Sequence, residues 1–135
     1  MVDIIKWDET CRVGVKELDD QHKHLFKICN DLIRTVVEKR VSEAGPETIQ
    51  QLKDYAELHF RREEELLQQA GYADAREHRL EHNRLMNDLL LFKSEYIAGD
   101  LDVSRVSEFL IEWILHHVKG TDRQYIDQLH SKGIS

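Results

Sequence analysis

The chain has 135 residues, 41% of them hydrophobic, which is typical of one soluble domain with a buried core. Its formal net charge of −7 disfavours nucleic acid or an anionic membrane surface as partner, because both select clustered Lys and Arg. We find no signal-peptide pattern and no apolar run long enough to cross a bilayer, so we expect a cytoplasmic protein without membrane insertion.

The N-terminal third predicts an arm followed by a first helix. Residues 1–18 mix apolar residues such as Trp7 and Val13 with charged ones and show no sustained period, which predicts an extended arm packed across the rest. From about residue 19 to residue 39, apolar residues recur every three or four positions, as on one helix face. They are Leu25, Phe26, Cys29, Leu32, Ile33 and Val36. His22 falls on the same face.

Two further helices follow at about residues 46–70 and 75–98. Pro46 is well placed as the first helical residue of the second, and Gly71 ends it. The inward positions of the second helix are Ile49, Leu52, Ala56, His59, Glu63 and Leu66. Asp74 and Glu77 have the spacing of a capping box at the start of the third helix. Its inward positions are His78, His82, Leu85, Met86, Leu89, Phe92 and Tyr96.

A fourth helix, about residues 102–130, completes the fold. Its inward positions are Val106, Leu110, Trp113, Ile114 and His117, and the pattern continues beyond Gly120. Strand and hairpin signals are lacking, and short connections imply antiparallel neighbours. The chain is therefore predicted to be all-α, one domain over residues 1–135, folded as an antiparallel up-down-up-down four-helix bundle with an extended N-terminal arm.

The inward faces carry an unusual number of titratable side chains. Five of the eight histidines and two carboxylates fall where a core would be apolar. They are His22, His59, Glu63, His78, His82, His117 and Asp122. Residues four apart differ by only about 40° around a helix, so His59 with Glu63, and His78 with His82, each share one face. Burial of so many unpaired groups would be costly without a shared partner, and a pair of metal ions supplies one. Imidazole and carboxylate together suit iron, manganese or zinc.

The last pair does not fit a regular helix. His117 and Asp122 are five residues apart, about 140° around an α-helix, which would aim them at different neighbours. We therefore predict a widened or kinked turn at Gly120 that brings Asp122 back toward the core.

Five segments in this order resemble the hemerythrins, specifically the single-domain bacterial form. They are Asp20–His22, His59–Glu64, Gly71–Tyr72 with His78 and His82, Trp113–Val118, and Asp122. Ferritin-like di-iron bundles are the main rival, but they use Glu-x-x-His motifs, and this chain contains none.

The resemblance implies two iron ions joined by Glu63, Asp122 and an oxo or hydroxo group. His78, His82 and His117 would saturate one iron, whereas His22 and His59 would leave the other with one open position for dioxygen. Leu25, Phe60, Leu66, Leu67, Trp113 and Ile114 are the expected apolar lining of the oxygen pocket.

Two classes of function follow. The leading hypothesis is a protein that carries, stores or senses dioxygen rather than an enzyme. The alternative is a di-iron oxidoreductase that acts on oxygen, peroxide or nitric oxide with electrons from a partner. An iron reservoir or a signalling module is a third possibility. The expected partners are dioxygen and either an electron donor or an oxygen-using enzyme, and the sequence leaves the oligomeric state open.

Overall fold

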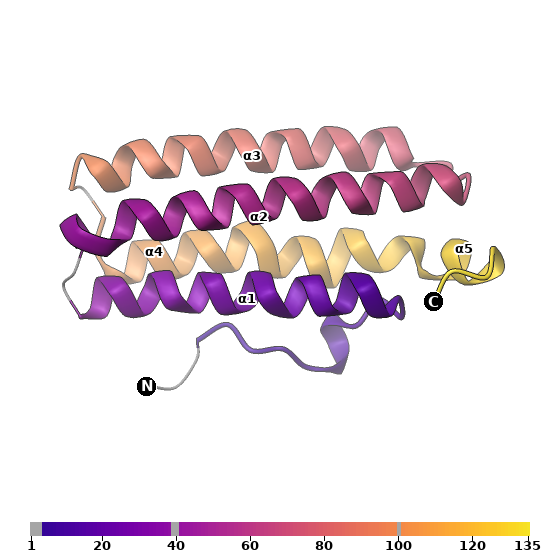
Figure 1. Cartoon of the computed structure of the whole chain (residues 1–135), viewed down its shortest axis with the longest axis horizontal. Helices are drawn as coiled ribbons and strands as arrows, with labels where there is room; N and C mark the ends of the chain where they lie inside the picture. The colour runs from indigo at the N-terminus through magenta and orange to yellow at the C-terminus, as the bar shows by residue number, and fades with distance from the viewer. Residues whose placement is uncertain (1–3, 39–40, 100) are drawn as a thin grey trace.

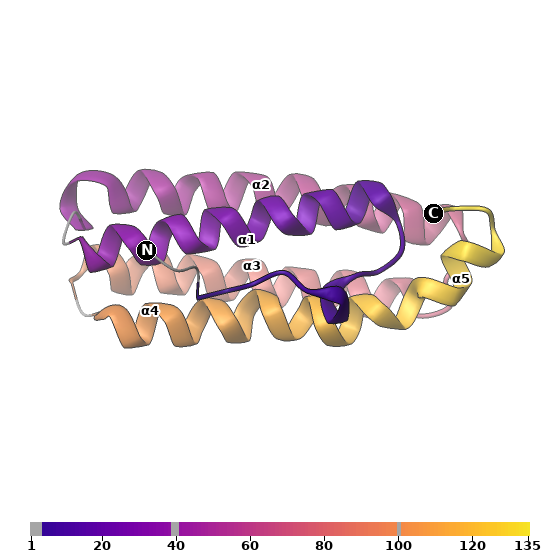
Figure 2. The same cartoon turned by 90° about the horizontal axis from the view of Figure 1, so that it is seen from below.

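Four long helical segments lie side by side in the computed structural model, which describes residues 4–38, 41–99 and 101–135 (Figure 1). They are α1 (Lys16–Val37), α2 (Val41–Gln69), α3 (Ala75–Ile97) and a last segment that begins with α4 (Val103–Leu110). Consecutive segments run in opposite directions, so the predicted up-down-up-down bundle is confirmed (Figures 1 and 2). The described residues contain no strand and no helix with the length and apolar character of a membrane span.

The second helix begins earlier than the sequence predicts. It starts at Val41 rather than near residue 46, so Pro46 lies inside the helix instead of opening it. A proline beyond the first turn loses the hydrogen bond from its own nitrogen, and its ring crowds the carbonyl four residues earlier, so the local sequence disfavours this start. Gly45 in the added turn is buried against Tyr96 of α3, and this tertiary contact is what the local pattern could not predict.

The last segment is helical along its predicted length but changes its turn type repeatedly. After α4 come two π-helical turns, Ile111–Leu115 and His117–Thr121, and a 3₁₀ turn at Asp122–Tyr125. The short helix α5 (Ile126–Ser131) follows and bends away at the end of the bundle (Figure 2).

The arm is extended, as predicted, and covers the seam between α1 and α4 (Figure 2). Asn30 of α1 fixes one end, because its amide accepts from the Ile5 backbone N–H at 2.9 Å and donates to the Ile5 carbonyl at 2.7 Å. The Asp19 carboxylate fixes the other end by accepting from the backbone N–H of Val13 at 2.8 Å and of Gly14 at 3.2 Å. The arm ends before residue 18, because α1 already begins at Lys16.

Candidate metal centre

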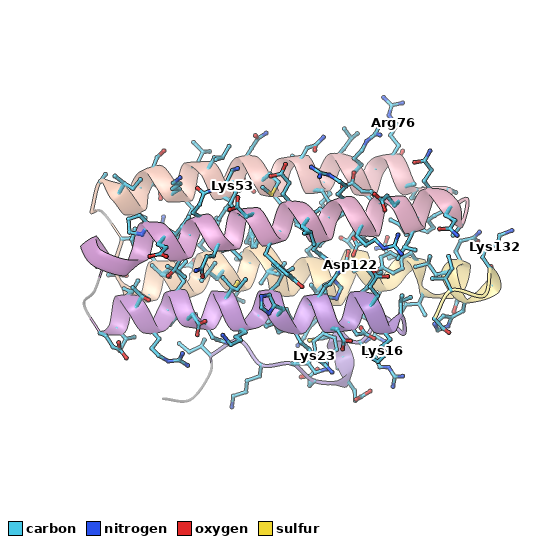
Figure 3. All side chains as sticks on the ribbon, viewed as in Figure 1. Lys16, Lys23, Lys53, Arg76, Asp122 and Lys132 are labelled. Atoms are coloured by element: carbon cyan, nitrogen blue, oxygen red, sulfur yellow. The ribbon has the colours of Figure 1, made fainter. Side chains whose placement is uncertain are left out.

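All seven candidate ligands lie in the interior, each with 3% or less of its surface exposed. His22 comes from α1, His59 and Glu63 from α2, and His78 and His82 from α3. The last segment contributes His117 and Asp122. In Figure 3, Asp122 lies between the helices, whereas Arg76 and Lys132 project outward.

Their ligand atoms form two groups, each with its members within 4.8 Å of one another. The first group, which we call the three-histidine position, contains His78, His82 and His117 together with Glu63 and Asp122. The second, the two-histidine position, contains His22 and His59 with the same two carboxylates. The structure therefore brings together all seven residues that the sequence singled out.

One oxygen of each carboxylate faces the three-histidine position. Glu63 Oε1 lies 2.5 Å from His78 Nε2 and 3.0 Å from His82 Nε2. Asp122 Oδ1 lies 3.0 Å from His78 Nε2 and 2.9 Å from His117 Nε2.

The other oxygen of each carboxylate faces the two-histidine position. Asp122 Oδ2 lies 3.2 Å from His22 Nε2, and Glu63 Oε2 lies 3.4 Å from His59 Nε2 and 3.6 Å from His22 Nε2. Each carboxylate thus spans the two positions, with one oxygen for each. This is the arrangement that a pair of bridging carboxylates requires.

The backbone of the last segment places Asp122 in this arrangement. The predicted widened turn is confirmed, because the Asp122 N–H donates to the carbonyl oxygen of His117, five residues earlier. Such a turn brings residues five apart onto one face. Gly120 lies within the turn, yet it does not have a positive φ and a Cβ built there would meet nothing within 4 Å. The widened turn therefore does not depend on the absence of a side chain at this position.

The polar atoms at the centre suit a metal ion. His59 Nε2, both ring nitrogens of His22 and both carboxylate oxygens of Asp122 are buried without a hydrogen bond in the described structure. Ligands at right angles on an octahedral ion, with bonds of about 2.1 Å, are about 3.0 Å apart. Four contacts of the three-histidine position match this spacing, including 3.1 Å between His82 Nε2 and His117 Nε2, whereas His78 Nε2 and Glu63 Oε1 lie closer, at 2.5 Å. Nitrogen and carboxylate donors in this number fit a metal centre.

The two carboxylates favour protonation of neighbouring histidines when metal is absent. Burial alone lowers the pKa of the His22 and His78 imidazoles, but Asp122 and Glu63 outweigh it and raise both to about 9. The pKa of His117 rises to about 10 for the same reason. Burial raises the pKa of Glu63 and Asp122, yet the surrounding histidines hold both well below the ordinary range. A metal ion bound here must therefore displace protons.

Three ligand histidines have partners on their outward nitrogens. His59 Nδ1 lies 2.6 Å from Gln21 Oε1, His82 Nδ1 lies 2.8 Å from Glu64 Oε2, and His117 Nδ1 lies 2.9 Å from Glu81 Oε1. Each contact leaves Nε2 free to face the cluster.

The sequence pattern does not identify these partners, because it contains no information on which helix flanks meet. One sequence feature could have pointed to these partners. Each partner is the immediate neighbour of a ligand along the chain: Gln21, Glu64 and Glu81. A neighbour in sequence lies about 100° around the helix, at the flank where it reaches an adjacent helix.

Tyr125 is a further polar residue at the centre of the cluster, and the sequence pattern does not single it out. Its side chain is fully buried, and its hydroxyl donates to Glu63 Oε2 at 3.1 Å. Burial and the nearby carboxylates raise the pKa of this phenol well above its ordinary value.

The six expected lining residues are all buried, and they divide between two apolar clusters. Leu25, Phe60, Trp113 and Ile114 belong to the larger cluster. Leu66 and Leu67 belong to the second, which also contains Tyr125 and residues of the arm. Phe60 stacks on His82, with ring centroids 4.0 Å apart and planes 5° apart, so an aromatic ring shields one face of this ligand.

Comparisons with known proteins agree with this geometry. Residues 13–129 match the family model described as the hemerythrin HHE cation binding domain. The chain is 31% identical over 126 residues to a bacteriohemerythrin of Clostridium acetobutylicum, covering 90% of this chain and 98% of the relative. It is 32% identical over 124 residues to a myohemerythrin of Theromyzon tessulatum, covering 92% of each. A wild-type hemerythrin crystal structure superposes with a TM-score of 0.82 at 29% identity, covering 93% of this chain and 98% of that one.

Proposed function

Because the chain belongs to the hemerythrin family, we propose that it is a non-heme di-iron protein that binds dioxygen reversibly. The observation that carries this proposal is the division of the two carboxylates, each with one oxygen toward each histidine group. A single metal site would not need that division. The donor set suits iron, manganese or zinc, and the family likeness favours iron among them.

The chain would hold the two ions unequally. His78, His82 and His117 with Glu63 Oε1 and Asp122 Oδ1 offer five donor atoms to one ion. His22 and His59 with Glu63 Oε2 and Asp122 Oδ2 offer four to the other. The second ion would therefore have one protein donor fewer, and this is where dioxygen would be expected to bind. When bound, the reduced iron pair supplies one electron from each ion to dioxygen.

The protein's own side chains would keep this process reversible by excluding water and stray protons. Leu25, Leu67 and Ile114 are fully buried, and Phe60 and Trp113 are nearly so. The Trp113 indole N–H is occupied, because it donates to the Leu85 carbonyl oxygen at 2.6 Å. Apolar packing on both sides of the cluster therefore supports oxygen binding rather than turnover.

Elemental analysis of protein made with iron available tests the proposal. We expect two irons per chain, and we expect Asp122→Ala to lose more than one of them, because this carboxylate faces both positions. His22→Ala should lose no more than one, since it faces only the two-histidine position. One zinc and no iron in the unmodified protein would contradict the proposal.

One observation favours the oxidoreductase as a second candidate. The Tyr125 hydroxyl is a proton donor at Glu63 Oε2, the oxygen on the side of the two-histidine position. A hydrogen-bond donor there would stabilise a reduced oxygen species and so favour reduction of oxygen, peroxide or nitric oxide over release of oxygen, although its raised pKa makes the phenol a weak acid. Steady consumption of oxygen with a supplied reductant, abolished by Tyr125→Phe at unchanged iron content, would favour this candidate.

A further inference from the structure

The outward partners of the ligand histidines differ between the two positions. At the three-histidine position, two ligands contact carboxylates: His82 contacts Glu64 at 2.8 Å, and His117 contacts Glu81 at 2.9 Å. The Thr121 hydroxyl also donates to Glu81 Oε1 at 3.0 Å and helps to hold it in place.

Among the described residues, no carboxylate other than Glu63 and Asp122 contacts a histidine of the two-histidine position, and Glu17, which acts on His59 from a distance, is paired with Arg62. His59 Nδ1 contacts the neutral amide oxygen of Gln21 at 2.6 Å, and His22 Nδ1 is buried without a hydrogen bond in the described structure. Glu63 and Asp122 each turn one oxygen toward each position, so neither carboxylate belongs to one position alone. The difference therefore lies in Glu64 and Glu81 on one side and Gln21 on the other.

The chemical consequence follows from how an imidazole binds a metal. A carboxylate that accepts from Nδ1–H fixes the tautomer and makes Nε2 more basic, so the metal bond is stronger. An amide oxygen also fixes the tautomer, but it carries no net charge. The three-histidine position thus has one more ligand, two extra negative charges nearby and more basic imidazoles.

Solvent and neighbouring cations limit the size of this effect. The Glu64 and Glu81 side chains are 27% and 30% exposed. Lys53 and Arg61 line the same surface cavity of about 370 Å³ as Glu64 and weaken its field. Loss of such a partner typically weakens metal binding by about 10- to 100-fold.

We propose that Glu64 and Glu81 are positioning residues that make the three-histidine position the tighter metal site, so that it fills before the two-histidine position. This inference rests on the proposed metal centre and adds an order of loading to it. It also assigns a role to Gln21, which keeps the two-histidine position the weaker of the two.

Stepwise titration of the metal-free protein with Co²⁺ tests the order, with the visible spectrum as readout and a competing chelator to measure each affinity. We expect two steps separated by at least about 10-fold. Glu64→Gln and Glu81→Gln keep an oxygen acceptor but remove the charge, and each should weaken binding at the three-histidine position by about 10- to 100-fold and leave the affinity of the two-histidine position unchanged. Gln21→Glu should strengthen the second step alone.

Matched variants separate this effect from general loss of charge. Glu95→Gln removes the same charge from an exposed position of α3, fourteen residues beyond Glu81, and should change neither step. His117→Ala should abolish the tighter step, and His22→Ala should abolish the weaker one.

Equal affinities for both ions, or the same weakening of both steps by Glu64→Gln, Glu81→Gln and Glu95→Gln, would overturn the inference while leaving the metal centre intact. Binding of a single Co²⁺, or none, would instead contradict the proposed two-metal centre. Gln21→Glu adds a carboxylate rather than removing one, so its result does not depend on the stability of the other variants.

Discussion

The backbone N–H of Asp122 donates to the carbonyl oxygen of His117 across a turn one residue wider than that of an α-helix. This bond places a carboxylate between the two histidine groups, although the spacing of the two residues predicts different faces. A second wide turn precedes it, where His116 donates to the carbonyl of Ile111. Wide turns of this kind often mark functional sites, and here the turn supplies one of the two shared carboxylates.

The wide turn should tolerate a side chain at Gly120. Its φ is not positive and nothing lies within 4 Å of a Cβ built there, so Gly120→Ala should leave iron content unchanged and raise the free energy of unfolding by up to about 1 kcal/mol. Urea unfolding and elemental analysis check both expectations. Loss of iron from this variant would mean that the turn needs glycine after all.

Gly45 should behave in the opposite way, because a Cβ there would overlap the ring and hydroxyl of Tyr96. Gly45→Ala should lower the free energy of unfolding by about 1–3 kcal/mol, the usual cost of overpacking. Removal of the Tyr96 hydroxyl, the nearest atom, should recover part of the loss in the double variant Gly45→Ala/Tyr96→Phe. No recovery would show that the hydroxyl is not the source of the strain.

Substitutions of ligands at the two positions should have different effects on iron content and on oxygen binding. His22→Ala and His59→Ala should retain iron at the three-histidine position and lose the colour change on exposure to oxygen. His117→Ala should lose iron together with the colour change, because it weakens the position with more ligands. Iron content and visible absorption measured on the same samples distinguish the cases. Equal loss of iron and colour in all three variants would leave the assignment without support.

The apolar lining should control how long the oxygenated state lasts. Ile114→Thr makes the lining smaller and more polar, so it should speed conversion to the oxygen-inert diferric form at unchanged iron content. Ile49→Thr is the control, since Ile49 is equally buried in the same cluster but lies away from the ligands in sequence, near the start of α2. Absorption followed over time in air gives the rate. Equal rates for the two variants would contradict a role of Ile114 in protecting the site.

The metal-free protein should lose stability as the pH rises. His22 and His117 have pKa values of about 9 and about 10 in the folded chain, above the ordinary 6.5 of an unfolded one. A histidine whose pKa is higher in the folded chain than in the unfolded chain stabilises the fold. This stabilisation is complete when the pH is below the pKa of the unfolded chain, and it is lost as the pH rises through the pKa of the folded chain. The free energy of unfolding should therefore fall between about pH 6.5 and pH 10.

The carboxylates do not offset this loss, because their lowered pKa values keep them charged throughout that range. Metal-loaded protein is the control, since bound metal replaces the protons, and its stability should change less over the same range. Urea titrations at several pH values measure both. A metal-free protein whose stability is constant or rises over the range would contradict the protonated cluster.

Periodicity was enough to predict the four helical segments and six of the seven members of the cluster, whereas Asp122 falls off the regular period and needs the wide turn. Spacings of three and four place His59 with Glu63, and His78 with His82, on inward faces, and a bundle with short connections must bring such faces together. The polar character of these inward positions was the informative signal, because a core tolerates it only when a partner is present.

Features that depend on neighbouring helices could not be predicted in this way. The early start of α2 rests on the contact of Gly45 with Tyr96, and the pairing of Glu64 with His82 rests on which flanks of α2 and α3 meet. The hydrogen bond from Tyr125 to Glu63 depends on the change of turn after Asp122, which re-aims the side chains that follow. Each of these contacts joins residues distant in sequence, and a local pattern contains no information about them.

The visible spectrum of the reduced, iron-loaded protein tests the central claim most directly. The spectrum is recorded without oxygen, then in air, and again after the oxygen has been removed. We expect new visible bands in air that disappear on deoxygenation and return over repeated cycles, because the buried, apolar surroundings of the site let oxygen leave intact. Permanent oxidation at the first exposure, with release of peroxide or water and turnover with added reductant, would contradict reversible oxygen binding.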